Sequence, residues 1–154
     1  MYRISTHGRY ALRMMADIAE QTSNPPHAAG QTIIAEQEGK IPFLSSISER
    51  QEISKKYLEH IARKLNTAGL LSGTRGRSGG YLLTRSAREI KVIDILDAVE
   101  TSMTIVDCLE CTPSSCPRKE QCKTLPLWTG LQKEITDYLS MVTLQDIVDG
   151  TVPE

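Results

Sequence analysis

The 154-residue chain is poor in aromatic residues and has no long apolar segment. With one Trp and one Phe, it is a poor candidate for a protein that binds single-stranded nucleic acid by base stacking. No apolar run approaches the roughly 18 residues that a membrane-spanning helix needs, and residues 1–5 do not begin a signal peptide. We therefore expect a cytoplasmic protein, in which reducing conditions disfavour structural disulfides.

Net charge is also nearly absent, at −1, but the basic residues are concentrated in one part of the chain. Between Lys55 and Lys91 there are nine Lys or Arg residues and two Glu residues, a local balance of +7. A basic segment of this kind gains affinity for DNA by displacing counterions from phosphates. The alternative is an ordinary solvated charged face, which is what most charge runs are.

The basic segment opens with the pattern of a helix-turn-helix. Over residues 54–65, apolar residues recur at helical spacing on one half of the predicted helix, and polar residues occupy the other half. Leu44, Ile47 and Ile53 supply the apolar positions of a shorter helix and a turn before it. The apolar half holds Tyr57, Leu58, Ile61, Ala62 and Leu65, and the polar half holds Lys55, Lys56, Glu59, His60, Arg63 and Lys64.

A glycine-rich basic run follows at residues 73–80, between two short apolar stretches. Its glycines permit a tight or bulged hairpin and let Arg75 and Arg77 come close to a phosphate backbone. Many helix pairs share the helix-turn-helix periodicity, but the added hairpin at this distance favours a winged DNA-binding domain. The predicted fold is mainly α with a small β-hairpin, a winged helix-turn-helix domain joined to a long dimerisation helix.

An amphipathic helix is predicted before this unit, over residues 6–21. The basic residues His7, Arg9 and Arg13 lie near its start, where they could touch a DNA backbone or be ordinary solvated residues. The apolar stripe of this helix holds Ala11, Leu12, Met15, Ile18 and Ala19.

A short helix is predicted after the unit, over residues 92–100. We expect its Ile93, Leu96 and Val99 to pack on the winged domain. Between the first helix and the helix-turn-helix, residues 23–42 contain prolines and glycines that interrupt any periodic pattern, and no function is assigned to them.

A long helix is predicted over residues 124–142, with apolar residues at alternating spacings of three and four. Since the winged unit has its own core, the simplest partner for this seam is the same helix of a second copy. The resulting two-fold dimer would bind a roughly palindromic duplex site. The alternative is that this helix packs against the rest of its own chain. Residues 143–146 resemble a capping box that opens one more short helix. The seam holds Trp128, Leu131, Ile135, Tyr138 or Leu139, and Val142.

All four cysteines of the chain lie in one segment with the spacing C-x2-C-x4-C-x5-C. They are Cys108, Cys111, Cys116 and Cys122. Thiolates at this density select zinc, copper(I) or an iron–sulfur cluster. Structural zinc usually shows two C-x2-C pairs and only one is present, so spacing alone leaves zinc and a cluster open. A thiol redox switch and four unrelated buried cysteines are further alternatives.

Several short motifs resemble those of one family of bacterial regulators. They include Ile47-Ser48-Glu49-Arg50-Gln51, Tyr57-Leu58-Glu59, Gly79-Gly80-Tyr81 and the early Gly8-Arg9-Tyr10-Ala11. Over nearly its whole length the chain resembles the winged-helix regulators typified by the iron–sulfur cluster regulator and the nitric-oxide-sensing repressor. Residues 23–42 are longer than the short connection usual in that family.

The resemblance implies a homodimeric transcription factor whose DNA affinity is set by an iron–sulfur cluster in the cysteine loop. It implies that Tyr57 and Glu59 lie at the groove-facing start of the recognition helix, and that Arg75 and Arg77 enter the minor groove. The residues expected to contact DNA are Arg9, Ser54, Lys55, Lys56, Tyr57, Glu59, His60, Arg63, Arg75, Gly76 and Arg77.

The resemblance also implies that three loop cysteines hold the cluster, matched by Cys116, Cys122 and either Cys108 or Cys111, with a fourth ligand that varies. None of the residues at the places of the family's usual fourth ligands can ligate; they are Leu125, Arg9 and Arg13. We therefore hypothesise an all-thiolate site in which all four cysteines ligate a [2Fe-2S] or a [4Fe-4S] cluster.

Two functional hypotheses follow. In the first, the cluster sets the DNA affinity of a homodimeric regulator that senses iron–sulfur status, redox state or nitric oxide. The second keeps the DNA binding and replaces the cluster with structural zinc or a thiol redox switch. An enzyme is not expected, because the sequence has no nucleotide-binding glycine loop, and its histidines, His7, His27 and His60, are scattered.

The expected organisation has three parts. Residues 1–100 form the winged helix-turn-helix DNA-binding domain, residues 101–123 the cysteine-rich cluster-binding loop, and residues 124–154 the dimerisation helix and C-terminal tail.

Overall fold

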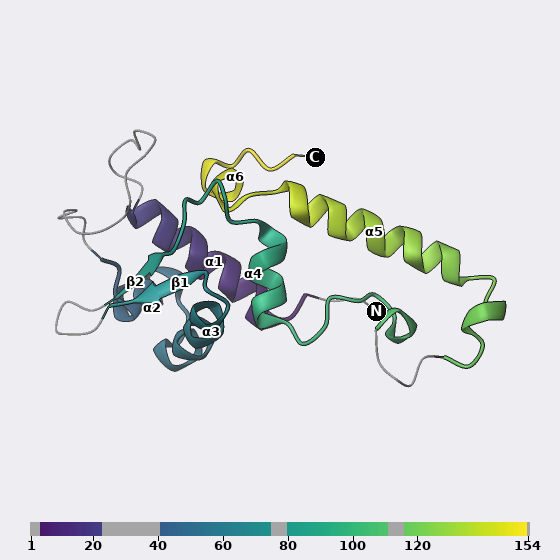
Figure 1. Cartoon of the computed structure of the whole chain (residues 1–154). Coiled ribbons are helices and arrows are strands. Elements are labelled where there is room, and N and C mark those ends of the chain that lie inside the picture. Colours follow the sequence, from purple (N-terminus) through teal and green to yellow (C-terminus); the bar gives the residue numbers. More distant parts are fainter. Residues whose placement is uncertain (1–3, 23–40, 75–79, 111–115, 154) are drawn as a thin grey trace.

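The computed structural model describes residues 4–22, 41–74, 80–110 and 116–153. The described part is mostly helical, with one two-stranded antiparallel hairpin, as the sequence predicts (Figure 1). The elements are α1 (Thr6–Thr22), α2 (Leu44–Gln51), α3 (Lys55–Thr67), β1 (Leu71–Gly73), β2 (Tyr81–Leu83), α4 (Val92–Val99), two 3-10 turns η1 (Asp107–Leu109) and η2 (Lys119–Gln121), α5 (Leu125–Met141) and α6 (Leu144–Asp149).

The main core is built around α1, which packs against α2, α3, α4, α6 and β2. Four residues of its predicted apolar stripe, Ala11, Met15, Ile18 and Ala19, are fully buried there. The predicted apolar half of α3 is buried too, except Tyr57, which is half-buried. Each fully buried Leu, Ile or Met side chain in such a core stabilises the fold by about 1.5–3 kcal/mol.

The turn between α2 and α3 is fixed by its own backbone and side chains. Glu52 ends α2 in the left-handed conformation, with φ +53°, and Ile53 then enters the core. The Ser48 hydroxyl donates to the Ile53 carbonyl at 2.6 Å, and the Ser54 hydroxyl caps α3 by accepting from the Tyr57 amide at 3.3 Å. These contacts hold α3 at a defined angle to α2, as a helix-turn-helix requires.

An ion pair between buried Asp17 and exposed Arg50 joins α1 to the end of α2. Asp17 is 3% exposed, and its carboxylate accepts from Arg50 Nε at 3.0 Å, from Arg50 Nη2 at 2.5 Å and from Gln51 Nε2 at 2.9 Å. The hydrogen bond to Asp17 raises the pKa of Arg50. This pair was not identified from the sequence, because the two residues lie far apart in the chain and only the fold brings them together.

The predicted wing is confirmed at its base. β1 and β2 pair antiparallel, with Leu71 opposite Leu83 and Gly73 opposite Tyr81. The strand pair is extended by the stretch before α2, where the Tyr81 amide donates to the Pro42 carbonyl at 3.2 Å. The tip of the wing, residues 75–79, lies outside the described residues, as do residues 23–40.

Helix α4 uses a different set of apolar residues from the one expected. Val99 packs in the main core as predicted, but Ile93 is only half-buried and Ile95 takes its place. The helix begins at residue 92 as predicted, but its packing against α1 and α3 buries the face formed by positions 92, 95, 96 and 99. Leu96 packs in a second small cluster, with Val92 and Val142.

The chain returns to the main core after α5. The predicted capping box is present: Thr143 Oγ1 accepts from the Asp146 amide at 3.1 Å, and Asp146 Oδ2 accepts from the Thr143 amide at 2.8 Å. The Leu144 amide donates to the Ile90 carbonyl at 2.9 Å, and the Leu144 side chain is fully buried. No helix in the described part is long and apolar enough to cross a membrane.

Candidate nucleic-acid interface and cysteine segment

The outer face of α3 carries most of the residues expected to contact DNA. Ser54, Lys55, Lys56, His60 and Arg63 are exposed on it, and Tyr57 and Glu59 are half-buried. Among the described residues, none of the three ion pairs involves a cation of this face. The face therefore presents basic groups that are not neutralised within the described chain, which suits a phosphate backbone.

The start of α1 lies against the start of α3 through a group of stacked rings. The His7 ring stacks on Tyr57, with centroids 4.9 Å apart, and meets His60 edge-on at 5.5 Å. Tyr10 packs edge-on against Tyr57 at 5.4 Å. His7 and His60 are far apart in the sequence and were expected to be scattered, but the contact between α1 and α3 brings them together. His27 lies outside the described residues.

The two arginines of α1 play different parts. Arg9 is exposed near the start of the helix and bonds only locally, from Nη2 to Thr6 Oγ1 at 3.5 Å, so it can reach a ligand. Arg13 donates from Nε to Gln51 Oε1 at 3.1 Å and from Nη2 to the Gln51 carbonyl, and its guanidinium lies 5.6 Å from the Tyr10 ring centroid. Arg13 thus ties α1 to the end of α2.

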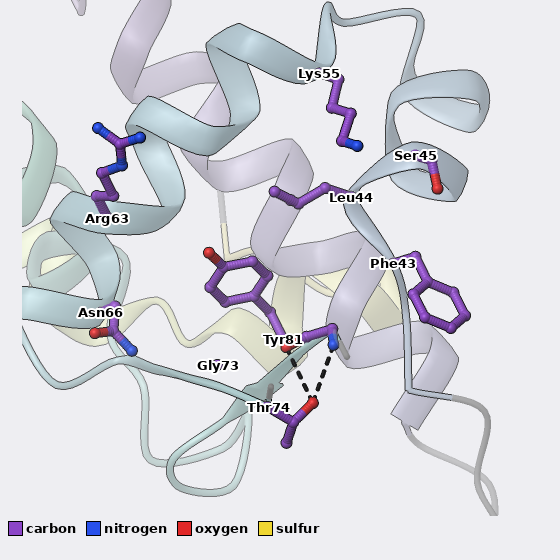
Figure 2. Close-up of a pocket in the computed structure, with 10 residues that line it drawn as sticks. Phe43, Leu44, Ser45, Lys55, Arg63, Asn66, Gly73, Thr74 and Tyr81 are labelled. Carbon is purple, nitrogen blue, oxygen red and sulfur yellow. Dashed lines mark hydrogen bonds between the residues drawn. The ribbon is translucent and has the colours of Figure 1, made fainter. Parts of the chain in front are cut away.

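A hollow of about 540 Å³ separates α3 from the wing (Figure 2). Lys55 and Arg63 line it on the side of α3, and the Tyr81 ring rises into it from β2. Its other lining residues are Phe43, Leu44, Ser45, Asn66, Gly73, Thr74 and Gly80. Sequence analysis did not find this hollow, since its walls come from four separate elements.

Three other expected DNA contacts, Arg75, Gly76 and Arg77, belong to the wing tip and lie outside the described residues. The same is true of Cys111. The placement of these four residues stays a prediction.

The cysteine segment contains three described cysteines, all free thiols. Cys108 lies in η1 and is half-buried, Cys116 is exposed, and Cys122 follows η2 and is half-buried. The Thr124 hydroxyl lies 3.3 Å from Cys122 Sγ, and this contact, with the Thr124 backbone amide, lowers the pKa of Cys122. A lowered pKa favours the thiolate, which is the form that binds metal.

The donor set of this segment fits a soft metal centre by its chemistry, because free thiols are the ligands that zinc and iron–sulfur clusters take. The described cysteines do not lie close enough together to form a metal site. Within residues 4–22, 41–74, 80–110 and 116–153, no group of three His, Cys, Asp or Glu side chains could hold a metal ion. Metal binding would therefore require the segment to close around the ion or cluster.

The segment is joined to the DNA-binding face at the end of α4. Glu100 Oε1 accepts from the Ser5 amide at 2.9 Å, at the start of α1, and Lys64 of α3 donates to the Val99 carbonyl at 2.8 Å. Gly8 lets Glu100 approach this closely, since a Cβ at Gly8 would lie 2.3 Å from Glu100 Oε1. Any displacement of residues 99–100 would therefore change contacts with both α1 and α3.

The segment is also joined to α5. Gln132 Oε1 accepts from the Ile105 amide at 2.9 Å, and Gln132 Nε2 donates to the Met103 carbonyl at 3.1 Å. These two hydrogen bonds hold residues 103–105, which precede the first cysteine, against the side of α5.

The seam of α5 differs from the predicted one. Its exposed large apolar residues are Leu127, Leu131, Tyr138 and Met141, spaced by four, seven and three residues as in a heptad seam. Predicted seam residues Trp128 and Ile135 are half-buried, and Val142 is buried in the second cluster with α4. Leu139 packs against that cluster, so one end of α5 is held within the chain, as the alternative expected.

Comparison with known proteins gives one consistent family. The family model described as Rrf2, iron-dependent transcriptional regulator, matches residues 4–150. The HTH-type transcriptional regulator IscR of Pectobacterium atrosepticum is 38% identical over 149 residues, covering 96% of this chain and 80% of that protein.

Solved structures agree. The T. potens IscR structure matches with a TM-score of 0.68 and 30% identity, covering 97% of this chain and 88% of that one. The structure of CymR, the global cysteine regulator of B. subtilis, matches with a TM-score of 0.69 and 28% identity, covering 98% and 99%.

Proposed function

Since the chain belongs to the Rrf2 family of transcriptional regulators, we propose that it binds duplex DNA as a homodimer and that its cysteine segment holds an iron–sulfur cluster by which DNA affinity is set. Its relatives are transcriptional regulators rather than enzymes, and DNA-binding regulation is the shared activity. In this proposal residues 1–100 bind DNA, residues 101–123 hold the cluster, and residues 124–154 form the dimer helix and tail.

The observation that carries the DNA contact is the basic face of α3, whose Lys55, Lys56 and Arg63 have no ion-pair partner among the described residues. In this proposal α3 enters the major groove, with Glu59 and His60 near base edges. Arg9 at the start of α1 adds a backbone contact beside it. The wing, with Arg75 and Arg77, would reach the adjacent minor groove.

The proposed dimer is supported by α5. Leu127 and Met141 are each 61% exposed and Leu131 is 45% exposed, on one stripe of a helix with no buried residue, all of its residues being described. A row of large apolar side chains in water is costly, and the same helix of a second copy would cover it. Two copies related by a two-fold axis would present two α3 helices to a roughly palindromic site.

The proposed cluster is supported by the thiol donors and by the description of the family as iron-dependent. Cys108, Cys116 and Cys122 are free thiols in the described part, and with Cys111 they would provide four thiolates. When bound, a cluster would supply a centre that can change charge, or be lost, in response to redox state, iron supply or nitric oxide. The lowered pKa of Cys122 favours its role as a ligand.

A contact path supports the coupling of the cysteine segment to DNA affinity. Closing the segment around a metal centre would pull on residues 101–107, which follow directly after Glu100. Glu100 bonds the start of α1, and Val99 bonds Lys64 of α3. A shift at this point would move His7 and Tyr57, which stack on each other, relative to the DNA.

A second candidate keeps the DNA binding but makes the cysteines a structural zinc site or a thiol redox switch. The lowered pKa of Cys122 favours a reactive thiolate, which a thiol switch also needs. The two candidates differ in what the isolated protein contains.

Purification without oxygen decides between them. The cluster predicts visible colour with iron and acid-labile sulfide, whereas zinc without colour supports the second candidate. Replacing each cysteine in turn by Ser should abolish the iron chromophore in every case. Full cluster loading in Cys108→Ser or Cys111→Ser would overturn the four-thiolate site, and a chain that binds no duplex at low salt would overturn the proposed function as a whole.

A further inference from the structure

The hollow between α3 and the wing has the charge of an anion site. Its ten lining residues include two cations, Lys55 and Arg63, and no carboxylate. Both cations are exposed, and the ion pairs recorded for the described residues involve neither. With two cations and no carboxylate in its lining, the hollow has a positive potential, which favours binding of an anion.

The hollow also presents neutral hydrogen-bonding groups to such an anion. Ser45 and Tyr81, which carry hydroxyl groups, are among its lining residues, and Tyr81 rises toward α3 from the opposite wall (Figure 2). Arginine can meet two oxygens of a phosphate at once through its planar guanidinium, which makes Arg63 the strongest single donor in this set.

The walls of the hollow are held in place by short-range contacts. Thr74 Oγ1 accepts from the Gly80 amide at 3.0 Å, and the Thr74 amide donates to the Gly80 carbonyl at 3.0 Å, closing the base of the wing. Asn66 Nδ2 donates to the Leu71 carbonyl at 2.9 Å, tying the end of α3 to β1. A Cβ at Gly80 would lie 2.5 Å from the Pro42 carbonyl oxygen, so only glycine lets the wing close this tightly.

We propose that this hollow binds one phosphodiester group of the DNA backbone, held between Arg63 and Lys55 on one side and the Tyr81 hydroxyl on the other. The inference rests on the proposed DNA binding, and deepens it by naming the contact that fixes the duplex between recognition helix and wing. A strand that passes from α3 to the wing must cross the hollow, which is why a backbone phosphate fits it better than a base edge.

Phosphate chemistry has a second possible source, a free phosphorylated small molecule. A volume of about 540 Å³ would accept either a segment of backbone or such a molecule. The open form of the hollow between two DNA-facing elements favours the backbone, and the test separates the two.

The test uses the full-length protein and a bound duplex in which one phosphate at a time is replaced by a neutral methylphosphonate. The wild-type protein should lose roughly tenfold in affinity at one backbone position in each half-site. Arg63→Ala should cost a similar factor on the unmodified duplex and should be insensitive to the methylphosphonate at that position. It should also lower the slope of log affinity against log salt by about 0.9.

Tyr81→Phe keeps the ring and removes only the hydroxyl, and it should weaken binding by roughly fivefold with the same positional dependence. The matched control is Arg88→Ala, an exposed cation outside the hollow, which should retain the full methylphosphonate sensitivity. Thermal unfolding of every variant, compared with wild type, checks that the fold is retained.

The outcomes separate the inference from the function on which it rests. Duplex binding in which Arg63→Ala and Arg88→Ala keep identical methylphosphonate profiles overturns the phosphate site and leaves the DNA binding standing. Tight binding of pyrophosphate that Arg63→Ala abolishes, without any positional effect on DNA, assigns the hollow to a free phosphorylated molecule and also overturns it. Loss of all duplex binding in the wild-type protein overturns both.

Discussion

Helices α3 and α5 are both amphipathic, yet they are held in different ways. Four of the 13 residues of α3 are buried, in the core formed with α1, whereas none of the 17 residues of α5 is buried, although the whole helix is described. α5 is joined to the rest of the chain by Leu139 at one end and by the Gln132 bonds along its flank. The DNA-binding unit thus has a buried core within one chain, whereas α5 contributes no buried residue.

The cysteine segment resembles α5 in this respect. Its two 3-10 turns, η1 and η2, contain no buried residue, and both turns are fully described. A segment without a core of its own gains order from a ligand or a partner more readily than from folding. A structural change in the cysteine segment or α5 therefore does not have to unfold the winged DNA-binding domain, which makes this part of the chain suitable for controlling DNA affinity.

The largest expected difference between the two regions is in stability. Ile61→Ala in α3 removes a fully buried side chain and should lower the free energy of unfolding by about 2–5 kcal/mol. Leu127→Ala in α5 should change it by less than about 0.5 kcal/mol in protein dilute enough to dissociate the proposed dimer. Denaturant titration measures both, and equal costs would mean that α5 is held by a core like that of α3.

A second prediction concerns assembly. Leu131→Asp places a charge in the exposed seam of α5 and should dissociate the proposed dimer, lowering affinity for a two-half-site duplex on the order of 100-fold. Sedimentation equilibrium and duplex titration measure the two effects. Thr129→Asp, on the opposite side of the helix, is the control and should leave both unchanged. A Leu131→Asp protein of unaltered mass in solution would remove α5 from the interface.

A third prediction concerns the link between the two regions. Glu100→Ala removes the acceptor at the start of α1 and should reduce the coupling between metal loading and DNA affinity by roughly 0.5–2 kcal/mol. Affinities of loaded and metal-free protein are compared for wild type and variant. Asp97→Ala, an exposed acid on the same helix, is the control. Undiminished coupling in Glu100→Ala would show that the signal takes another route.

The smallest expected effect concerns the pH dependence of stability at Asp146. The Thr143 hydroxyl, followed by its backbone amide, lowers the pKa of Asp146. The stabilisation is therefore present above the ordinary Asp pKa of about 3.9 and is lost as pH falls through the lowered value. Asp146→Asn should lower the melting temperature slightly near neutral pH and make no difference in strong acid. A deficit that grows toward low pH would have the wrong sign.

Local patterns in the sequence were sufficient for much of this architecture. The buried half of α3 and the capping box of α6 depend on spacings within one element, and both were predicted correctly. What could not be predicted depends on contacts between distant elements. The Asp17–Arg50 pair, the meeting of His7 with His60 and the hollow beneath the wing all require the packing of α1, α2, α3 and the hairpin.

Two mistaken positions have a related cause. Ile93 and Val142 were assigned from periodicity alone, which does not show which face of a helix meets its neighbours. In the fold, Ile95 of α4 packs in the main core, and Val142, directly after α5, packs in the second cluster. The cysteine spacing predicted a set of donors but not their arrangement, since the described segment holds them apart.

The most direct test compares one oxygen-free preparation before and after its metal is removed, using the same labelled duplex and the same salt concentration. DNA affinity should change by about 5- to 150-fold, while the circular dichroism spectrum and the cooperative unfolding of the winged DNA-binding domain stay the same. Equal affinities for the two forms, with this domain folded in both, would contradict control of DNA binding by the cysteine segment.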